Sequence, residues 1–436
     1  MIGMLSIFLA ISQTLIDSGF SNALIQRKDR TDVDYSTVFY FNIAIGIFLY
    51  IIAFFSAPFI AEFFNQPLLT SLFRVITLTF IFNSLIVVQR AITTINIDFK
   101  RQAYINVTSS VSSGILGIIL AFNGYGVWSL AFQSVAHSII SCSLYWKYTK
   151  WTPLLLFSID SFKRLFSYGS KILASGLLHT FYMQLTPVLI GKFYPPSALG
   201  YYSRAEHLAN LPLHNITMVL QRVTFPIMSK IQDDDQRLIM IYGKYLRVSS
   251  MVIFYVIFLL VVIAEPLITI LLGEKWQSSI LPFQLLCVAF IFDHLFSVNL
   301  NLLQVKGRSD LFLYLEIIKK TISVILILAG LYLGGVIGLC ISRIIYSQIA
   351  LVINTYYTGK LFRYSYKEQV RDFIPYLLIA FVANAPSLIL IYVVHEMWIN
   401  LIVDVVLSAT LYATILYLKQ DEFLLLGLSY IKTKYK

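Results

Sequence analysis

Charged residues are scarce in this chain, since they make up 13% of its 436 residues, whereas about 25% is usual in a soluble protein. Catalytic motifs are missing too: the sequence contains no HExxH, GxSxG, CxxC or P-loop spacing. The three cysteines, Cys142, Cys287 and Cys340, show no paired spacing, and we interpret them as small core residues rather than a metal or redox site. The sequence therefore predicts no cofactor and argues against an enzyme.

Long polar segments are also missing, and apolar runs take their place. Hydrophobic residues make up 58% of the chain, and its mean hydropathy is +0.77. An apolar helix of about 20 residues crosses a hydrocarbon layer of about 30 Å. We predict thirteen such helices, over residues 2–19, 36–60, 70–89, 104–123, 126–146, 165–191, 206–228, 247–272, 277–303, 311–333, 335–357, 373–394 and 398–418. The fold class is therefore an all-α polytopic membrane protein, whose function depends on its helices and short loops.

The basic residues are distributed unevenly between the predicted loops. If the helices alternate in direction, one face holds twenty-four lysines and arginines, whereas the other holds only Lys192, Arg204 and Lys275. The positive-inside rule makes the basic face cytoplasmic, so the C-terminus is cytoplasmic and the net charge of +11 does not indicate nucleic-acid binding. Thirteen helices then leave Met1 outside without a basic leader. We therefore predict a fourteen-helix design whose first helix is missing.

Two similar stretches predict an internal duplication. "FRVITLTFIFNSL" begins at Phe73 and "FQLLCVAFIFDHL" begins at Phe283, in the third and ninth predicted helices. Because six crossings separate them, the copies run in the same direction and predict parallel repeats that form two helix bundles around a central cleft. We assign residues 1–150 to an N-terminal lobe of five helices with one missing, residues 151–360 to a C-terminal lobe of six, and residues 361–436 to two appended helices and a basic tail.

Several loop and helix-end segments resemble a known family. They are "SNALIQRKDRTDVDYSTVFYFN" from Ser21, "GSKILASGLLHTFYMQLTPVLIGKFYPPSALGYYSRAEHLANLP" from Gly169, "FPIMSKIQDD" from Phe225, "EPLITILLGEKWQ" from Glu265 and "GRSDLFLYLEIIKK" from Gly307. The chain resembles polysaccharide flippases of the Wzx type, in the branch of colanic-acid and teichuronic-acid exporters within the multidrug/oligosaccharidyl-lipid/polysaccharide exporter superfamily.

The resemblance implies a flippase that carries an undecaprenyl-pyrophosphate-linked oligosaccharide repeat across the bacterial inner membrane by alternating access and ion antiport. Its partners would be the lipid-linked cargo, H⁺ or Na⁺, membrane lipids, and a polysaccharide polymerase with chain-length machinery. A drug or cation antiporter of the same superfamily is the main alternative. A membrane polysaccharide polymerase fits less well, because the predicted outer face has no sizeable polar loop.

Lys319 and Lys320 lie about 14 Å from the cytoplasmic end of their predicted helix, which places them near the midplane. Charged groups at this depth usually serve function. One interpretation is that they bind the anionic pyrophosphate of the cargo. A second is a structural ion pair with Glu316, at i,i+3 and i,i+4, although one carboxylate does not neutralise two lysines. A third is that the lysines snorkel to the cytoplasmic interface. Glu316 is also a candidate for ion coupling.

Three arginines within predicted helices are further candidates for cargo binding. Arg343 is expected at a depth similar to that of the lysine pair, so that both line one cavity. Arg74 and Arg222 are weaker candidates, because each lies near a helix end, where arginine also serves as an interface anchor. A cationic interior favours an anionic cargo over a cationic drug.

Acidic residues within the helices are candidates for ion coupling. Asp293 lies near the middle of the ninth predicted helix, at the position that Asn83 takes in the first copy of the duplication. A buried carboxylate of this kind either exchanges an ion or makes a structural contact between helices. Asp17 lies near a helix end, and Asp404 belongs to the appended pair, so both are weaker candidates.

Overall fold

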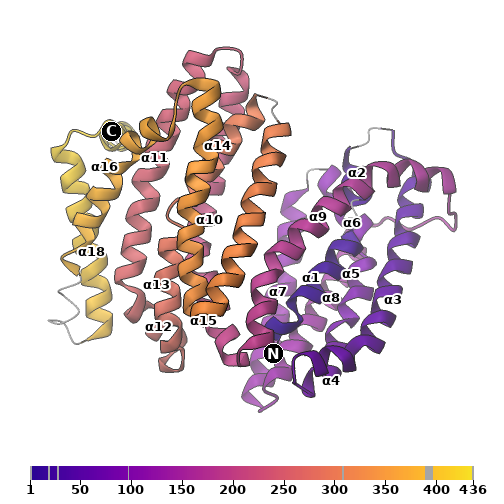
Figure 1. The fold of residues 1–436 in the computed structure, drawn as a ribbon. Coiled ribbons are helices and arrows are strands. Elements are labelled where there is room, and N and C mark those ends of the chain that lie inside the picture. The colour runs from indigo at the N-terminus through magenta and orange to yellow at the C-terminus, as the bar shows by residue number, and fades with distance from the viewer. Residues whose placement is uncertain are drawn as a thin grey trace. The chain divides into compact units, whose positions relative to one another are not determined.

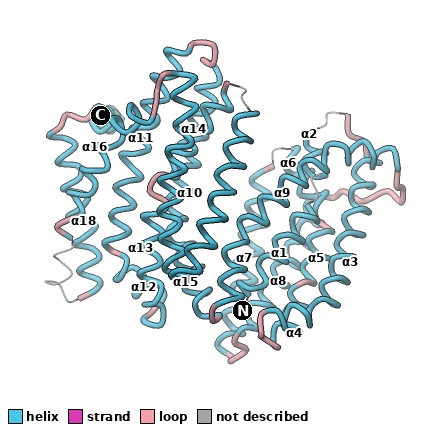
Figure 2. Tube along the Cα trace, viewed as in Figure 1, coloured by secondary structure: helices cyan, strands magenta, loops and turns pink. Residues whose placement is uncertain are grey.

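The computed structural model of the chain describes residues 2–17, 20–26, 29–96, 98–306, 309–387 and 396–434. These residues form helices joined by short loops, and no strand occurs among them (Figure 2). Within the described residues, seven helices are long and apolar enough to cross a membrane, or up to eight if one bent pair forms a single span. The predicted class, an all-α multi-pass membrane protein, is confirmed. The predicted number of thirteen helices stays a prediction.

The helices group into two compact units, Met1–Leu199 and Gly200–Lys436 (Figure 1). The first unit contains α1 (Ile2–Asp17), α2 (Phe20–Gln26), α3 (Asp32–Phe63), α4 (Leu68–Ile76), α5 (Leu78–Ser84), α6 (Val87–Ile95), α7 (Phe99–Phe122), α8 (Val127–Thr149) and α9 (Ile159–Phe193). The second contains most of α10 (Pro196–Lys230), then α11 (Asp235–Val262), α12 (Ala264–Leu272), α13 (Ile280–Ala289), α14 (Asp293–Val305), α15 (Ser309–Phe362), α16 (Tyr366–Asn384), α18 (Met397–Leu418) and α19 (Glu422–Lys434).

The division between the units falls after α9, whereas the sequence suggested a boundary at residue 150, before this helix. Helix α9 packs against α1, α2 and α3, so its apolar surface is buried within the first unit. The number of membrane-crossing helices in each lobe, with one missing from the first, stays a prediction. The relation of the two units as parallel repeats stays a prediction.

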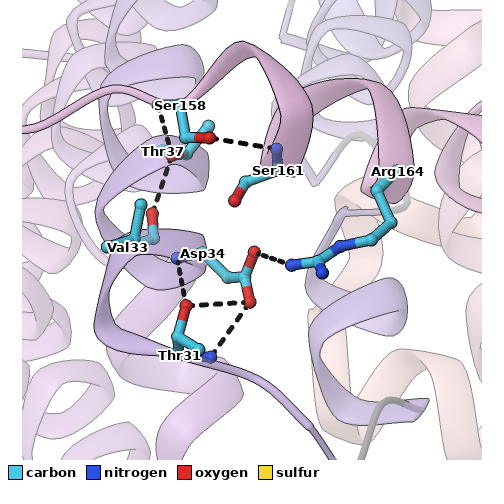
Figure 3. A network of polar contacts seen from close by, with 7 residues as sticks. All are labelled: Thr31, Val33, Asp34, Thr37, Ser158, Ser161 and Arg164. Carbon is cyan, nitrogen blue, oxygen red and sulfur yellow. Dashed lines mark hydrogen bonds and ion pairs between the residues drawn. The ribbon is translucent and has the colours of Figure 1, made fainter.

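A polar network attaches the start of α9 to the start of α3 (Figure 3). Thr31 caps α3 through a capping box with Asp34, whose side chain is fully buried. Arg164 of α9 donates from Nη2 to Oδ1 of Asp34 at 2.6 Å. Ser158, the cap of α9, donates its backbone N–H to Oγ1 of Thr37 at 3.1 Å. Because a buried carboxylate needs a cationic or hydrogen-bonded partner, this network adds a polar attachment to the packing of α9 within the first unit.

Helix α15 is a hairpin of two predicted helices. Gly334 and Gly335 leave the helical conformation, and Gly335 has a φ of 60°, which favours glycine. The two halves approach closely beside this turn, since a Cβ built on Gly330 would lie 2.5 Å from the carbonyl oxygen of Gly338. Helix α15 packs against both α13 and α14. The charged residues of each half are therefore held within the second unit.

Candidate functional site

The charged residues of α15 have partners on three other stretches of the second unit. Lys319, Lys320 and Glu316 lie on the first half of the hairpin, and Arg343 lies on the second. Helices α13 and α14 pack against α15, and α10 reaches it through the contacts of Arg343. These side chains form what we call the charged cluster: Tyr202, Glu206, Asp293, Glu316, Lys319, Lys320 and Arg343.

Glu316 contacts both lysines, as the structural interpretation predicted. Its Oε1 lies 2.5 Å from Nζ of Lys319, and its Oε2 lies 3.9 Å from Nζ of Lys320. The two lysines differ in exposure, since the side chain of Lys319 is 5% exposed and that of Lys320 is 34% exposed. Lys319 therefore belongs to the packed interior of the unit, whereas Lys320 is accessible.

Arg343 has two polar partners on α10. Its Nη1 donates to the hydroxyl of Tyr202 at 2.7 Å and pairs with the carboxylate of Glu206. The guanidinium also lies over the ring of Phe290, 5.0 Å from its centroid, in a cation–π contact. Tyr202 is fully buried and lies one turn before Glu206 on the same helix face. The arginine is thus held in one orientation by three groups.

Sequence reasoning missed Tyr202 and Glu206. The predicted helix began at residue 206, which left Tyr202 outside it and put Glu206 at its first position, whereas α10 begins at Pro196. The available signal was a carboxylate and a tyrosine four residues apart, which puts them on one face of a helix. That spacing alone does not identify Arg343 as the partner, because the partner lies far along the sequence.

Asp293 is the first residue of α14 and follows a break in the helix after α13. Its side chain is exposed, although its neighbours Phe292, His294 and Leu295 are buried. No ion pair within 4.0 Å of its carboxylate occurs in the described part of the chain. The charges of Arg343 and Lys319 nevertheless both act on it. Asp293 is therefore an accessible carboxylate within electrostatic reach of both predicted cationic sites.

The charged cluster is elongated and balanced in charge. Counted along the helix from the turn at Gly335, Arg343 lies about 12 Å and Lys319 about 24 Å away. The expectation that they lie at similar depth in the membrane stays a prediction. The cluster contains three cations, Lys319, Lys320 and Arg343, and three carboxylates. The three cations are thus matched in number by three carboxylates, of which Glu316 and Glu206 form ion pairs with them.

The remaining candidates lie in the first unit or outside the described side chains. Arg74 donates from Nε to the carbonyl oxygen of Phe54 at 3.2 Å and lies over the ring of the same residue, at 4.2 Å from its centroid. These contacts support the interpretation of Arg74 as an anchor at a helix end. The side chain of Arg222, on α10, falls outside the described side chains.

Asp17 belongs to a second polar network, in the first unit. Its Oδ1 accepts from Nε2 of Gln13 at 3.2 Å and lies 4.0 Å from Nη1 of Arg90. Asn83 donates from Nδ2 to Oε1 of Gln13 at 2.8 Å. Asn83, which the duplication pairs with Asp293, therefore also lies in a network with a carboxylate and a cation. His294, next to Asp293, lies 3.2 Å from Oγ of Ser250 through Nε2, so it has a structural partner.

The sequence matches one family of known proteins. The pattern of the family described as "Polysaccharide biosynthesis protein" matches residues 1–282. Teichuronic acid biosynthesis protein TuaB of Bacillus subtilis (strain 168) is 27% identical over 327 residues, which cover 74% of this chain and 66% of TuaB. Lipopolysaccharide biosynthesis protein WzxC of Escherichia coli (strain K12) is 24% identical over 397 residues, which cover 88% of this chain and 78% of WzxC.

Solved structures share the fold. The lipid II flippase MurJ, in an inward closed conformation, superposes with a TM-score of 0.73 at 15% identity, over 95% of this chain and 93% of that one. A multidrug resistance MATE family transporter in an inward-facing conformation superposes with a TM-score of 0.63 at 16% identity, over 82% of this chain and 90% of that one. At this level of identity the likeness concerns the fold alone.

Proposed function

Because the chain belongs to the polysaccharide biosynthesis protein family, we propose that it is a flippase of the bacterial inner membrane with a cytoplasmic C-terminus. Its cargo would be an undecaprenyl-pyrophosphate-linked oligosaccharide repeat, carried from the cytoplasmic to the outer leaflet. Two relatives are named for the biosynthesis of teichuronic acid and lipopolysaccharide, and one structural neighbour is named a lipid II flippase. These names support transport of a lipid-linked glycan and agree with the prediction that the chain is not an enzyme.

The charged cluster is the observation that carries this proposal. A pyrophosphate group is anionic, and Lys319, Lys320 and Arg343 supply cations within segments that are otherwise apolar. Lys320 is accessible and holds its carboxylate partner at 3.9 Å, a weaker contact than that of Lys319. Lys320 is therefore the group that meets the anionic cargo first, with Lys319 and Arg343 behind it.

The charge balance of the cluster supports ion coupling. With Asp293 ionised the cluster has no net charge, and with an ion bound to Asp293 it has one positive charge. An anionic headgroup is therefore held more strongly when Asp293 carries an ion, because fewer negative charges oppose it. This balance supports coupling between ion and cargo but by itself favours binding them together, so the proposal of antiport rests on the family resemblance. Glu316 and Asp17 remain proposed ion-coupling groups, while Arg74 and Arg222 remain proposed cargo contacts of lower rank.

We propose alternating access, in which the charged cluster is open to one side of the membrane at a time, and antiport with H⁺ or Na⁺, as the family resemblance implies. Membrane lipids surround the apolar helices. A polysaccharide polymerase with its chain-length machinery would consume the exported repeat.

A drug or cation exporter is the second candidate, and one observation favours it. The cluster contains three carboxylates, of which Asp293 is accessible, and carboxylates suit a cationic cargo. A MATE family transporter also shares the fold. An exporter of this kind would protect cells from cationic compounds and leave the lipid-linked glycan pool unchanged.

Complementation tests both functions. A bacterial strain whose own gene for this protein has been deleted receives either the unmodified chain or the variant Lys319→Ala/Lys320→Ala. The amounts of surface polysaccharide and of lipid-linked repeat are then measured. We expect the deletion to accumulate lipid-linked repeat, the chain to restore export, and the double variant to insert normally without restoring it. The matched control is Lys100→Ala/Lys147→Ala, which removes two lysines from helix ends. Absence of accumulation in the deletion strain contradicts flipping; full export by the double variant contradicts the role of the lysines.

A further inference from the structure

Helix α18 buries a carboxylate, Asp404, that has no cationic partner among the residues that the structure describes. The side chain of Asp404 is 0% exposed, and neither of its oxygens has a hydrogen-bond partner of normal geometry among the described residues. The cationic side chains of the neighbouring helix α11 are engaged elsewhere. Lys244 lies 3.5 Å from Glu422, and Arg247 lies over the ring of Phe423 at 5.6 Å. An ionised Asp404 would thus be an uncompensated charge in the interior of a membrane protein, which is strongly unfavourable.

The surroundings of Asp404 supply further oxygens without partners. Asn400 and Asp404 lie one turn apart on α18, and helix α16 packs against this helix. Asn384 at the end of α16 and Ser387 just beyond it are both buried. Within the described residues, Oδ1 of Asn384, Oγ of Ser387 and Oδ1 of Asn400 have no hydrogen-bond partner. Ser387 lies close enough for its hydroxyl to act on the Asp404 carboxylate.

The kind of atom that is left without a partner indicates the kind of ligand. The amide nitrogen of Asn384 donates to the carbonyl oxygen of Ala380 at 2.8 Å, which leaves its oxygen as the unpaired atom. Two amide oxygens, one hydroxyl oxygen and one carboxylate therefore lie on α18 and at or just beyond the end of α16, which packs against it, and the Ser387 hydroxyl is the one donor that acts on the carboxylate. Hard cations prefer such oxygen ligands. Because the site contains a single carboxylate, a monovalent cation neutralises it, whereas a divalent cation would leave a buried positive charge.

We propose that Asp404, with the side-chain oxygens of Asn384, Ser387 and Asn400, binds one alkali cation between α16 and α18. The site is distinct from the charged cluster, since none of its four residues belongs to that cluster. The site consists of one carboxylate and three neutral oxygens. Among the described residues, no group of three or more histidines, cysteines or carboxylates is placed to hold a metal ion, so this site is of a different kind. The cation would stabilise the packing of the appended helix α18 on the second unit.

Thermal unfolding of the purified full chain in detergent tests this site. The melting temperature is measured in NaCl and in choline chloride at equal ionic strength, and again in KCl. We expect NaCl or KCl to raise it by about 3 °C or more relative to choline, since a ligand that binds only the folded state stabilises it. Binding of radioactive sodium to the same preparation should saturate at about one ion per chain.

The variant Asp404→Asn keeps the shape of the side chain and removes its charge, so it should abolish both the cation-specific shift and the sodium binding. Asp421→Asn is the matched control, because it removes a carboxylate just after α18, far along the helix from Asp404. If Asp404→Asn does not fold, Ser387→Ala and Asn400→Leu keep the carboxylate and should each weaken sodium binding at least several-fold. Equal melting temperatures in the three salts would show that the carboxyl group of Asp404 is protonated instead. A cation-specific shift that survives in Asp404→Asn would show that the cation binds elsewhere. Either result would overturn the proposal. None of these measurements depends on flippase activity.

Discussion

Arg343 pairs with Glu206 on a different helix of the same unit, and Tyr202 accepts a second hydrogen bond from the same guanidinium nitrogen. The side chain of Arg343 is 26% exposed and that of Glu206 is 30% exposed, so the ion pair is mostly removed from solvent. Such a pair gives the arginine a fixed position from which it reaches Asp293 electrostatically. The guanidinium of Arg343 therefore already has a carboxylate partner before any cargo binds.

Arg343→Ala should therefore lower both stability and export. Loss of one member of a buried ion pair leaves the charge of the other uncompensated, at a cost of about 3 kcal/mol. Because part of this pair is exposed, we expect Arg343→Ala to lower the free energy of unfolding by about 2 kcal/mol. Arg343→Lys keeps the charge but loses the simultaneous contact with two acceptors, so we expect intermediate stability and export. The check is a thermal melt and a polysaccharide assay for each single variant and for the double variant Arg343→Ala/Glu206→Ala. Additive effects in this double-mutant cycle would mean that the two residues do not interact.

Lys319 and Lys320 should separate stability from transport. Lys319→Ala leaves Glu316 beside a buried position without its 2.5 Å partner, so we expect a loss of stability of about 2 kcal/mol. Lys320→Ala removes an accessible charge with a 3.9 Å partner, so stability should change by less than about 1 kcal/mol while export falls at least several-fold. Melting curves and export by the two single variants test this difference. The opposite order, with Lys320 needed for stability and Lys319 for transport alone, would contradict the assignment.

The sequence was sufficient for the fold class because apolar runs of membrane length and the distribution of basic residues are local properties. It also singled out Lys319, Lys320, Glu316, Arg343 and Asp293 as candidates, because a charge within an apolar run can be recognised from the sequence alone; their roles stay predictions. The partners of Arg343 could not be found in this way, because Tyr202 and Glu206 lie far away in sequence. The grouping of α9 with the first unit was missed for the same reason, since it depends on Asp34 and Arg164.

The contact between Asp34 and Arg164 should be one of the strongest polar interactions of the first unit. Asp34 is fully buried and bonds Arg164 at 2.6 Å, although the arginine side chain is 45% exposed. Arg164→Ala should reduce the free energy of unfolding by about 2 kcal/mol, because it removes the ion-pair contact of a buried carboxylate and leaves it with hydrogen bonds from Thr31 and Ser161. Export should fall with it if the start of α9 has to stay beside α3.

Arg101→Ala is the control for this prediction. Arg101 and Asp98 lie 3.0 Å apart, but both side chains are partly exposed, at 43% and 29%. Exposed pairs contribute at most about 1 kcal/mol, so the melting temperature should change little. Equal losses in Arg164→Ala and Arg101→Ala, measured by thermal melts of the purified chain, would show that the network in Figure 3 adds no more than a surface pair.

Asp293→Asn should uncouple transport from the ion gradient. The substitution fixes the charged cluster in the state with one net positive charge, so we expect tighter binding of a pyrophosphate headgroup and export that no longer responds to an imposed gradient. The measurement uses membrane vesicles with a proton or sodium gradient of either direction and follows the side on which a pyrophosphate-linked glycan is found. Antiport requires that an ion gradient directed from outside to inside accelerates export by the unmodified chain. The charge balance alone makes ion and cargo bind together, which predicts acceleration by a gradient in the opposite direction. Acceleration by neither gradient, or an unchanged response in Asp293→Asn, would remove Asp293 from the coupling mechanism.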